Sequence, residues 1–175
     1  IVLPYIIFAQ NPQSRLWTVP PNSLQFPSLT VNSLPNPGGS DYNQAQSSFA
    51  NNTMHDPNGN LLFFIVDGNV YDRNGLLIGP IFSPSLGAAV TGVTEWAIIP
   101  VPGNCKQYYL VGGAYSRSND LSNYPGGTPL PCYITLDLSL NNSNLSGNPN
   151  ALGDFVNHST DAHFLITNRI WIFSC

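Results

Sequence analysis

Three apolar runs follow one another in the centre of this chain, at residues 61–66, 69–71 and 76–78. Asp67-Gly68 and Asn74-Gly75 lie between these runs, and a further Asn-Gly pair within residues 56–60 precedes the first one. Asp-Gly and Asn-Gly pairs between β-rich segments are strong signals for tight hairpin turns. The pattern therefore predicts a meander of short antiparallel strands.

Further apolar runs predict strands on the C-terminal side of this meander, at residues 96–101, 107–111, 133–140, 162–167 and 170–173. Residues 133–140 alternate apolar and polar side chains, which predicts a strand with one buried face. Residues 11–48 are rich in Pro, Asn, Ser and Gly, and they predict irregular chain that wraps around the core, with short strands at 16–19 and 29–31. Beyond that segment about eight strands are expected, so the predicted fold class is all-β.

Composition supports the same fold class and excludes two kinds of partner. Charged residues make up 8% of the chain, against roughly 25% in a typical soluble domain. Lys106 is the only lysine and Glu95 the only glutamate, which argues against long amphipathic helices. With five basic residues and a net charge of −4, the chain lacks the clusters that neutralise phosphates of nucleic acids or anionic membranes. No nucleic-acid partner is expected.

The first nine residues are almost all apolar and end at Ala9. They predict the tail of a signal peptide with cleavage before Gln10, and an N-terminal β-strand is the alternative. No other segment approaches the roughly 20 apolar residues needed to span a bilayer, so no membrane span is expected. Residues 10–175 are then a single secreted all-β domain. Its last apolar run, 170–173, would be an uncovered sheet edge, which predicts that the natural polypeptide continues.

Three cysteines are present, Cys105, Cys132 and Cys175, so at least one is unpaired within the chain. Cys105 and Cys132 each precede a predicted strand. If those strands are antiparallel neighbours, the two cysteines lie at opposite ends of the ladder, about 25 Å apart. A disulfide needs Cα atoms within about 7 Å, so this pairing is not expected in a simple hairpin.

Residues 54–79, MHDPNGNLLFFIVDGNVYDRNGLLIG, are followed by EWAIIPVPGNCKQYYLV and later by YITLDLSLNNSN and NALGDF. These segments resemble the N-terminal region of large secreted Bacteroidetes proteins that carry a C-terminal type IX secretion sorting domain. The resemblance implies a β-propeller-like fold, export and surface display, and no known chemistry. Eight strands correspond to about two four-stranded blades, hence a fragment of a propeller, and a small β-sandwich is the alternative.

Asp56, Asn58 and Asn60 alternate in the manner of the first ligands of a calcium loop. Leu61 stands where that motif requires glycine, and the distant bidentate glutamate is missing. A hairpin turn explains the same residues, because Asp and Asn tolerate left-handed backbone. These three positions are the only metal candidates, and no cofactor is predicted.

His158, Ser159, Asp161 and His163 form the only cluster that resembles a hydrolase set. A nucleophile, a base and its orienting group usually come from separate segments, and no G-x-S-x-G elbow is present. The sequence therefore predicts no enzyme and no catalytic residue.

Three aromatic residues, Trp17, Trp96 and Tyr108, are candidates for stacking on sugar rings if they are exposed. The alternative is that they fill the β core. The function expected overall is a non-catalytic extracellular module of a larger secreted or cell-surface protein, with a scaffold or adhesive role. Its partners would be glycans or other surface proteins. The first alternative is a self-assembling filament subunit that uses residues 1–9 as a donated strand; a secreted hydrolase is the second.

Overall fold

The computed structural model of the chain describes residues 16–26, 28–36, 38–83, 88–89, 95–115, 129–156 and 163–164. All regular elements longer than one residue in these ranges are β-strands, as the sequence predicts. Every strand pairing is antiparallel. Within the described ranges there is no helix long and apolar enough to cross a membrane.

Three sheets contain most of the strands, and each is a meander in sequence order. The first sheet consists of β1 (Leu16–Val19), β2 (Asn22–Gln25) and β3 (Thr30–Ser33). The second consists of β4 (Asn51–His55), β5 (Leu61–Val66), β6 (Asn69–Asp72) and β7 (Leu77–Pro80). The third consists of β10 (Ala97–Pro100), β11 (Gln107–Tyr115), β12 (Pro129–Asn141) and β13 (Leu152–Phe155), and β14 (His163–Phe164) also pairs with β12. A short ladder joins β8 (Phe82–Ser83) to β9 (Ala88–Ala89).

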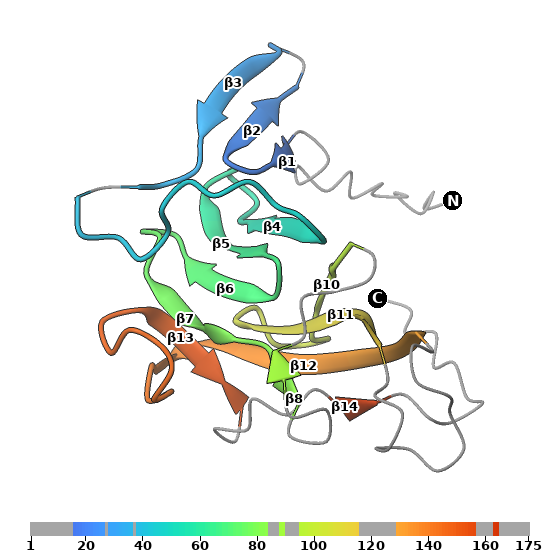
Figure 1. The fold of residues 1–175 in the computed structure, drawn as a ribbon. Coiled ribbons are helices and arrows are strands. Elements are labelled where there is room, and N and C mark those ends of the chain that lie inside the picture. The colour runs from blue at the N-terminus through green and yellow to red at the C-terminus, as the bar shows by residue number, and fades with distance from the viewer. Residues whose placement is uncertain are drawn as a thin grey trace, which may run out of the picture.

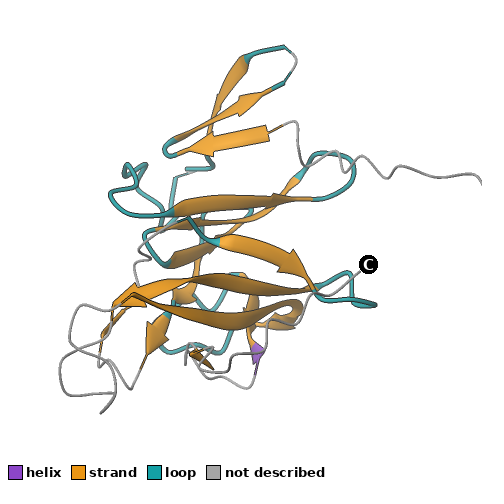
Figure 2. Ribbon diagram, turned by 90° about the vertical axis from the view of Figure 1, so that its right-hand side faces the viewer, coloured by secondary structure: helices purple, strands orange, loops and turns teal. Residues whose placement is uncertain are grey.

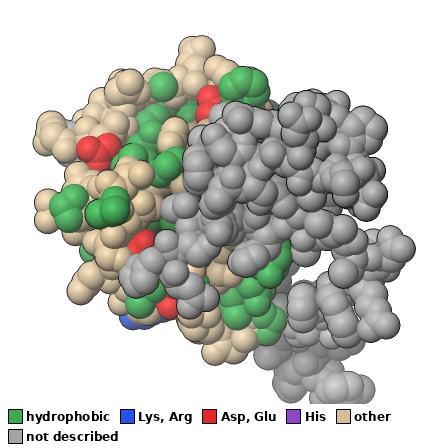
Figure 3. Space-filling view, turned by 60° about the horizontal axis from the view of Figure 1, so that its bottom comes forward, with side chains coloured by type: hydrophobic (Ala, Val, Ile, Leu, Met, Phe, Trp, Pro, Cys, Tyr) green, Lys and Arg blue, Asp and Glu red, His purple; other side chains and the backbone are tan. Residues whose placement is uncertain are grey.

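The three sheets are stacked in the order in which the chain forms them. Figure 1 shows β1–β3 at the top, β4–β7 in the middle and β10–β13 below, and the turned view in Figure 2 shows the same layers. In Figure 3, the visible surface of the described residues is mostly hydrophobic side chains together with backbone and uncharged side chains, and the few acidic side chains are scattered. The surface there agrees with the low charged fraction of the sequence.

Two turns of the same sequence pattern, Asp-x-Asn-Gly, close the hairpins β4–β5 and β6–β7. In the first, Asp56 Oδ1 accepts the backbone N–H groups of Asn58 and Asn60, at 2.9 and 2.8 Å. In the second, Asp72 Oδ1 accepts the N–H groups two and four residues later, at 2.7 and 3.0 Å. The glycine of each turn has a positive φ, 87° at Gly59 and 80° at Gly75, which a side chain would disfavour. Both predicted turns are confirmed.

The main core lies between the second and third sheets. It contains Phe63 and Ile65 of β5 on one side and Leu110 and Leu136 of β11 and β12 on the other, all with no exposed surface. Trp96, also fully buried, lies in this core just before β10. This face-to-face packing of two apolar sheet surfaces holds the second and third layers together.

The other face of the second sheet is buried as well, which explains why residues 61–66 are apolar without alternation. Phe64 and Val66 of β5 point to this side and pack with Leu34 and Tyr42. The Tyr42 ring meets the Phe64 ring edge-on at 5.1 Å, and its hydroxyl donates to the Ala45 carbonyl at 2.8 Å. The prediction that residues 11–48 only wrap around the core is therefore wrong in one respect. This segment contributes Leu34 and Tyr42 to a buried cluster.

The raised pKa of the buried Tyr42 hydroxyl predicts that the folded protein loses stability at high pH. Burial, and secondarily the neighbouring Tyr71, raises the pKa of Tyr42 from 10.0 to about 12. The folded protein therefore holds this proton more tightly than the unfolded chain, so the stabilisation is complete below pH 10 and is lost as the pH rises towards 12. We expect Tyr42→Phe to lose about 1 kcal/mol at pH 8, where the hydrogen bond matters, and to be less sensitive to pH above 10. Urea unfolding of both proteins between pH 8 and 11.5 measures this; parallel pH curves would contradict it.

Five short strands were not expected from the sequence. They are β2 (Asn22–Gln25), β4 (Asn51–His55), β13 (Leu152–Phe155) and the pair β8–β9. β4 has the sequence NNTMH, which carries no apolar pattern, and becomes a strand by pairing with the apolar β5. The predicted strand 170–173 and residues 1–9 lie outside the described residues.

The ladder of the third sheet bears out the argument about the cysteines. Cys132 in β12 stands opposite Gly112, whereas Cys105 lies before Gln107 at the start of β11. Cys105 and Gly112 are seven residues apart, which along a strand is about 23 Å. Cys105 is therefore too far from Cys132 for a disulfide. Cys105 is a free, exposed thiol.

Candidate functional site

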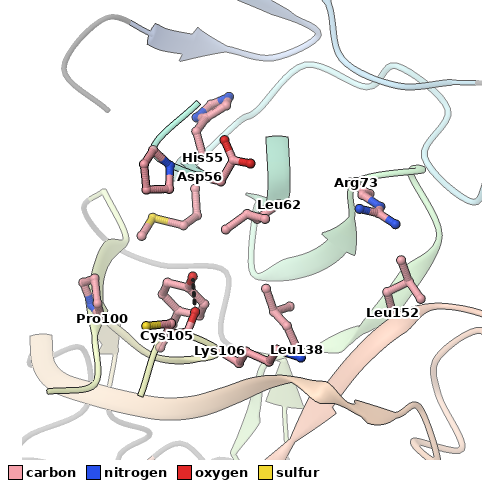
Figure 4. A pocket seen from close by; sticks show the side chains of 12 residues that line it. His55, Asp56, Leu62, Arg73, Pro100, Cys105, Lys106, Leu138 and Leu152 are labelled. Atoms are coloured by element: carbon pink, nitrogen blue, oxygen red, sulfur yellow. Dashed lines mark hydrogen bonds between the residues drawn. The ribbon is translucent and has the colours of Figure 1, made fainter. Parts of the chain in front are cut away.

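A pocket of about 650 Å³ opens where the turns of the second sheet meet the ends of strands in the third. This volume is within the range of small-molecule sites in proteins. Figure 4 shows the side chains around it. The lining residues come from the β4–β5 and β6–β7 hairpins, from the β10–β11 hairpin, and from β12 and β13: Met54, His55, Asp56, Pro57, Leu62, Arg73, Pro100, Cys105, Lys106, Tyr108, Leu138 and Leu152.

The upper wall is held by the first Asp-x-Asn-Gly turn. The Asp56 carboxylate accepts two backbone N–H groups on Oδ1, and on Oδ2 it accepts the side-chain amide of Asn60 at 2.8 Å. These hydrogen bonds, the Asn60 amide first, lower the pKa of Asp56 below its ordinary value. Asp56 is therefore a fixed negative charge at neutral pH, and its oxygens are occupied by the turn.

The lower wall is the start of β11. Burial raises the pKa of Tyr108, so its hydroxyl keeps the proton at neutral pH. That hydroxyl donates to the backbone carbonyl of Cys105 at 3.1 Å, which ties the turn to the strand. Tyr108 also meets Phe63 of the second sheet edge-on at 5.2 Å between ring centres. The aromatic pair thus fixes the distance between the two sheets beside the pocket.

His55 and Cys105 are the side chains of this pocket with the chemistry of a base and a nucleophile. They lie on opposite walls of the pocket (Figure 4). Burial lowers the pKa of His55, and the nearby Asp56 only partly opposes this, so the imidazole is neutral at pH 7. A nucleophile and its base must be within hydrogen-bonding reach, and this arrangement keeps the two groups apart.

Two cations complete the lining. Arg73 occupies the second position of the β6–β7 turn, as Pro57 does in the β4–β5 turn, and both line the pocket. Lys106 lies on the lower wall next to Leu138, whose backbone N–H donates to the Lys106 carbonyl at 2.9 Å. The rest of the floor is aliphatic, with Leu62, Leu138 and Leu152. The pocket combines an apolar floor with two positive charges and one negative charge.

The calcium candidates Asp56, Asn58 and Asn60 all lie in the β4–β5 turn. Asn58 and Asn60 act there as hydrogen-bond donors to Asp56 rather than presenting oxygens to a common centre. Among the side chains that the structure describes, no group of three or more His, Cys, Asp or Glu residues is arranged to hold a metal. The turn geometry accounts for the pattern of these residues.

The three aromatic candidates differ in the exposure of their side chains. Trp17 is 59% exposed on β1, where it pairs with Leu24 of β2, and it remains a candidate for stacking. The expected exposure of Trp96 and Tyr108 is wrong, because their side chains are 0% and 4% exposed. Both belong to the core between the second and third sheets. Trp96 has no exposed face for a sugar, whereas Tyr108 is a buried residue of the pocket wall.

The hydrolase candidates are not brought together in the described part of the chain. His158, Ser159 and Asp161 lie outside it, and His163 is described only as a backbone position in β14, opposite Tyr133.

The pocket residues Arg73, Lys106 and Cys105 were missed as a site by the sequence reasoning. A usable signal was present, since two of only five basic residues stand in or next to hairpin turns. Turns from different sheets meet at this pocket. This meeting is a feature of the tertiary structure, and no local sequence pattern shows it.

Comparison with known proteins adds no relative. No family model matches the sequence, and neither a curated protein nor a solved structure matches it.

Proposed function

We propose that this chain is a non-catalytic, exported β module that binds a ligand in the pocket between its second and third sheets, as part of a larger secreted or cell-surface protein. The observation that carries this proposal is the state of the pocket's reactive groups. The Asp56 carboxylate and the Tyr108 hydroxyl are both engaged in hydrogen bonds that hold the fold together. His55 and Cys105 lie on opposite walls, so what the pocket offers a ligand is shape, aliphatic surface and charge.

The scaffold around the pocket suits a binding role. Short strands closed by hydrogen-bonded turns leave few torsions to be ordered when a ligand arrives, and a preorganised site loses less entropy on binding. Asp67 illustrates this at the opposite end of the second sheet: its carboxylate accepts the N–H groups of Ser48, Phe49 and Ala50 and the hydroxyl of Ser47. Turns of this kind hold the loops in place through hydrogen bonds, and they need few charged side chains on the surface.

Export and the propeller architecture belong to the same proposal. Two sequential antiparallel meanders packed face to face support a pair of propeller blades, although a small β-sandwich has the same kind of packing. The apolar segment before Gln10 and the resemblance to secreted Bacteroidetes proteins support export and a scaffold or adhesive role. Trp17 is the surface position at which a glycan would stack.

A fragment screen by NMR tests the binding proposal. ¹⁵N-labelled protein is mixed with small acids, bases, sugars and neutral compounds, and backbone shifts are mapped onto the structure. We expect perturbations to concentrate at the pocket, for example at Leu138 and Leu152, with every compound recovered unchanged by mass spectrometry. Leu145, which is fully exposed in the β12–β13 loop and does not line the pocket, serves as a control position.

Two results would count against this proposal. Chemical conversion of a compound at the pocket would show that the chain is an enzyme. Shifts confined to other surfaces would show that the pocket is not the binding site.

A further inference from the structure

The charges of the pocket are unusual for this chain. The protein has nine acidic and five basic residues, yet the pocket is lined by two basic residues, Arg73 and Lys106, and one acidic residue, Asp56. With His55 neutral, the lining carries one net positive charge in a protein whose total is −4. The side chains that line the pocket therefore have a net charge of opposite sign to that of the whole chain.

Carboxylates near the two cations are already occupied by the fold. Asp137 lies close enough to Lys106 for the lysine to lower its pKa, but its oxygens accept the N–H and hydroxyl of Ser139 and the amide of Gln107. Asp72, next to Arg73 in the turn, accepts three backbone N–H groups. Arg73 and Lys106 are both exposed and line the pocket, so a ligand there can reach their hydrogen-bond donors.

The floor between these cations is apolar. Figure 4 shows Arg73 and Lys106 on different sides of the pocket, with Leu62, Leu138 and Leu152 around the space between them. Asp56 lies on the upper wall. Apolar surface of this kind favours an apolar ligand body, whereas guanidinium and ammonium groups favour an anionic head group. Asp56 repels an anion from the upper wall and so orients the ligand.

We infer that the pocket binds a carboxylate attached to an aliphatic or aromatic body, with the carboxylate at one of the two cations, Arg73 or Lys106, and the body on the leucine floor. This inference rests on the proposed binding function and names its ligand class. A single negative charge matches the net charge of the lining, whereas a dianion such as a phosphate monoester would bring a second charge into an apolar site, where desolvation is costly.

A matched pair of probes tests the charge requirement. 4-Phenylbutanoate and 4-phenylbutanamide have nearly the same shape and differ in charge. Cys105 lines the pocket as a free thiol, so a bound probe should slow its alkylation by iodoacetamide, a neutral reagent. The rate at Cys105 is followed by peptide mass spectrometry, which separates it from Cys132 and Cys175. We expect the acid to give half-maximal protection at a concentration at least fivefold lower than the amide.

Charge variants test the assigned residues. In the double variant Arg73→Gln/Lys106→Gln we expect the acid to lose its advantage, while protection by the amide stays the same. Asp56→Asn is the matched control of opposite sign, and it should strengthen binding of the acid. Circular dichroism verifies that each variant is folded, and Lys106→Gln alone, at an exposed position, should lose part of the advantage.

The outcomes separate this inference from the proposed function. If acid and amide protect equally, or the preference survives in the double variant, the carboxylate inference is wrong although the pocket still binds ligands. If neither probe slows alkylation and the fragment screen finds nothing at the pocket, both proposals fail.

Discussion

Replacing Trp96 by alanine is expected to lower the free energy of unfolding by about 3–5 kcal/mol. The indole has no exposed surface and lies in the core that joins the second and third sheets. It packs flat against β11 at Gly112, where a Cβ would come within 2.6 Å of the ring. Its backbone carbonyl also accepts the side-chain amide of Asn52, so this residue connects β4 to the third sheet. Urea unfolding followed by far-UV circular dichroism measures the loss.

Trp17→Ala is the matched control for this prediction. The same side chain is removed, but at a position that is 59% exposed, so the expected loss is below about 1 kcal/mol. If Trp96→Ala does not fold, Trp96→Phe gives the answer at a smaller cost. Phenylalanine keeps most of the buried surface and also removes the indole N–H, which is buried and has no hydrogen-bond partner among the described residues. Equal losses at positions 17 and 96 would contradict the assignment of the core.

The second large effect is expected at Asp72. Its side chain is fully buried, and Oδ2 accepts the backbone N–H of Leu152 at 3.0 Å, which links the β6–β7 turn to β13. In Asp72→Asn the retained oxygen still closes the turn, but the amide N–H₂ group faces the Leu152 N–H. Two donors then meet without an acceptor, and we expect a loss of about 2 kcal/mol in unfolding free energy. Hydrogen exchange at Leu152 should also become faster.

Asp56→Asn tests whether the effect comes from this link and not from the turn itself. Asp56 makes the same two turn hydrogen bonds through Oδ1. Its Oδ2 meets a side-chain amide, that of Asn60, which can rotate to present its oxygen instead. We therefore expect a much smaller loss than at Asp72. Similar losses in the two variants would show that the turn, and not the contact between sheets, determines the stability.

The hairpins of the second sheet were predictable because their signals are local. A type of turn that needs positive φ selects Gly and tolerates Asp or Asn, and Asp67 and Gly68 indeed have φ values of 49° and 78°. The alternation predicted for residues 133–140 holds in its first half, where Ile134 and Leu136 are buried while Tyr133 and Thr135 are partly exposed. It is wrong beyond that point, where Asp137 is buried and Leu140 is exposed. The correctly predicted features depend on residues that are close in sequence.

The candidate site was not predictable in the same way. Asp56 and Asp72 occupy the same position in two turns that look alike in sequence, and nothing local distinguishes Asp56, which lines the pocket, from Asp72, which links the second sheet to β13. Trp17 lies in a short strand and Trp96 lies just before one, and both have polar residues nearby in the sequence. Trp96 is nevertheless buried and Trp17 is exposed. Their burial depends on which sheet covers which face, and this is a contact between distant segments.

The sequence by itself determined that the chain is all-β and where its tight turns lie, since strand patterns and turn residues act over two to eight neighbours. Only the tertiary structure decided which faces are covered, that residues 34–42 complete a second core, and that Arg73, Lys106 and Cys105 line one pocket. The physical reason is that burial and electrostatic environment come from sheets packing on one another, which joins residues as far apart in sequence as Asp72 and Leu152.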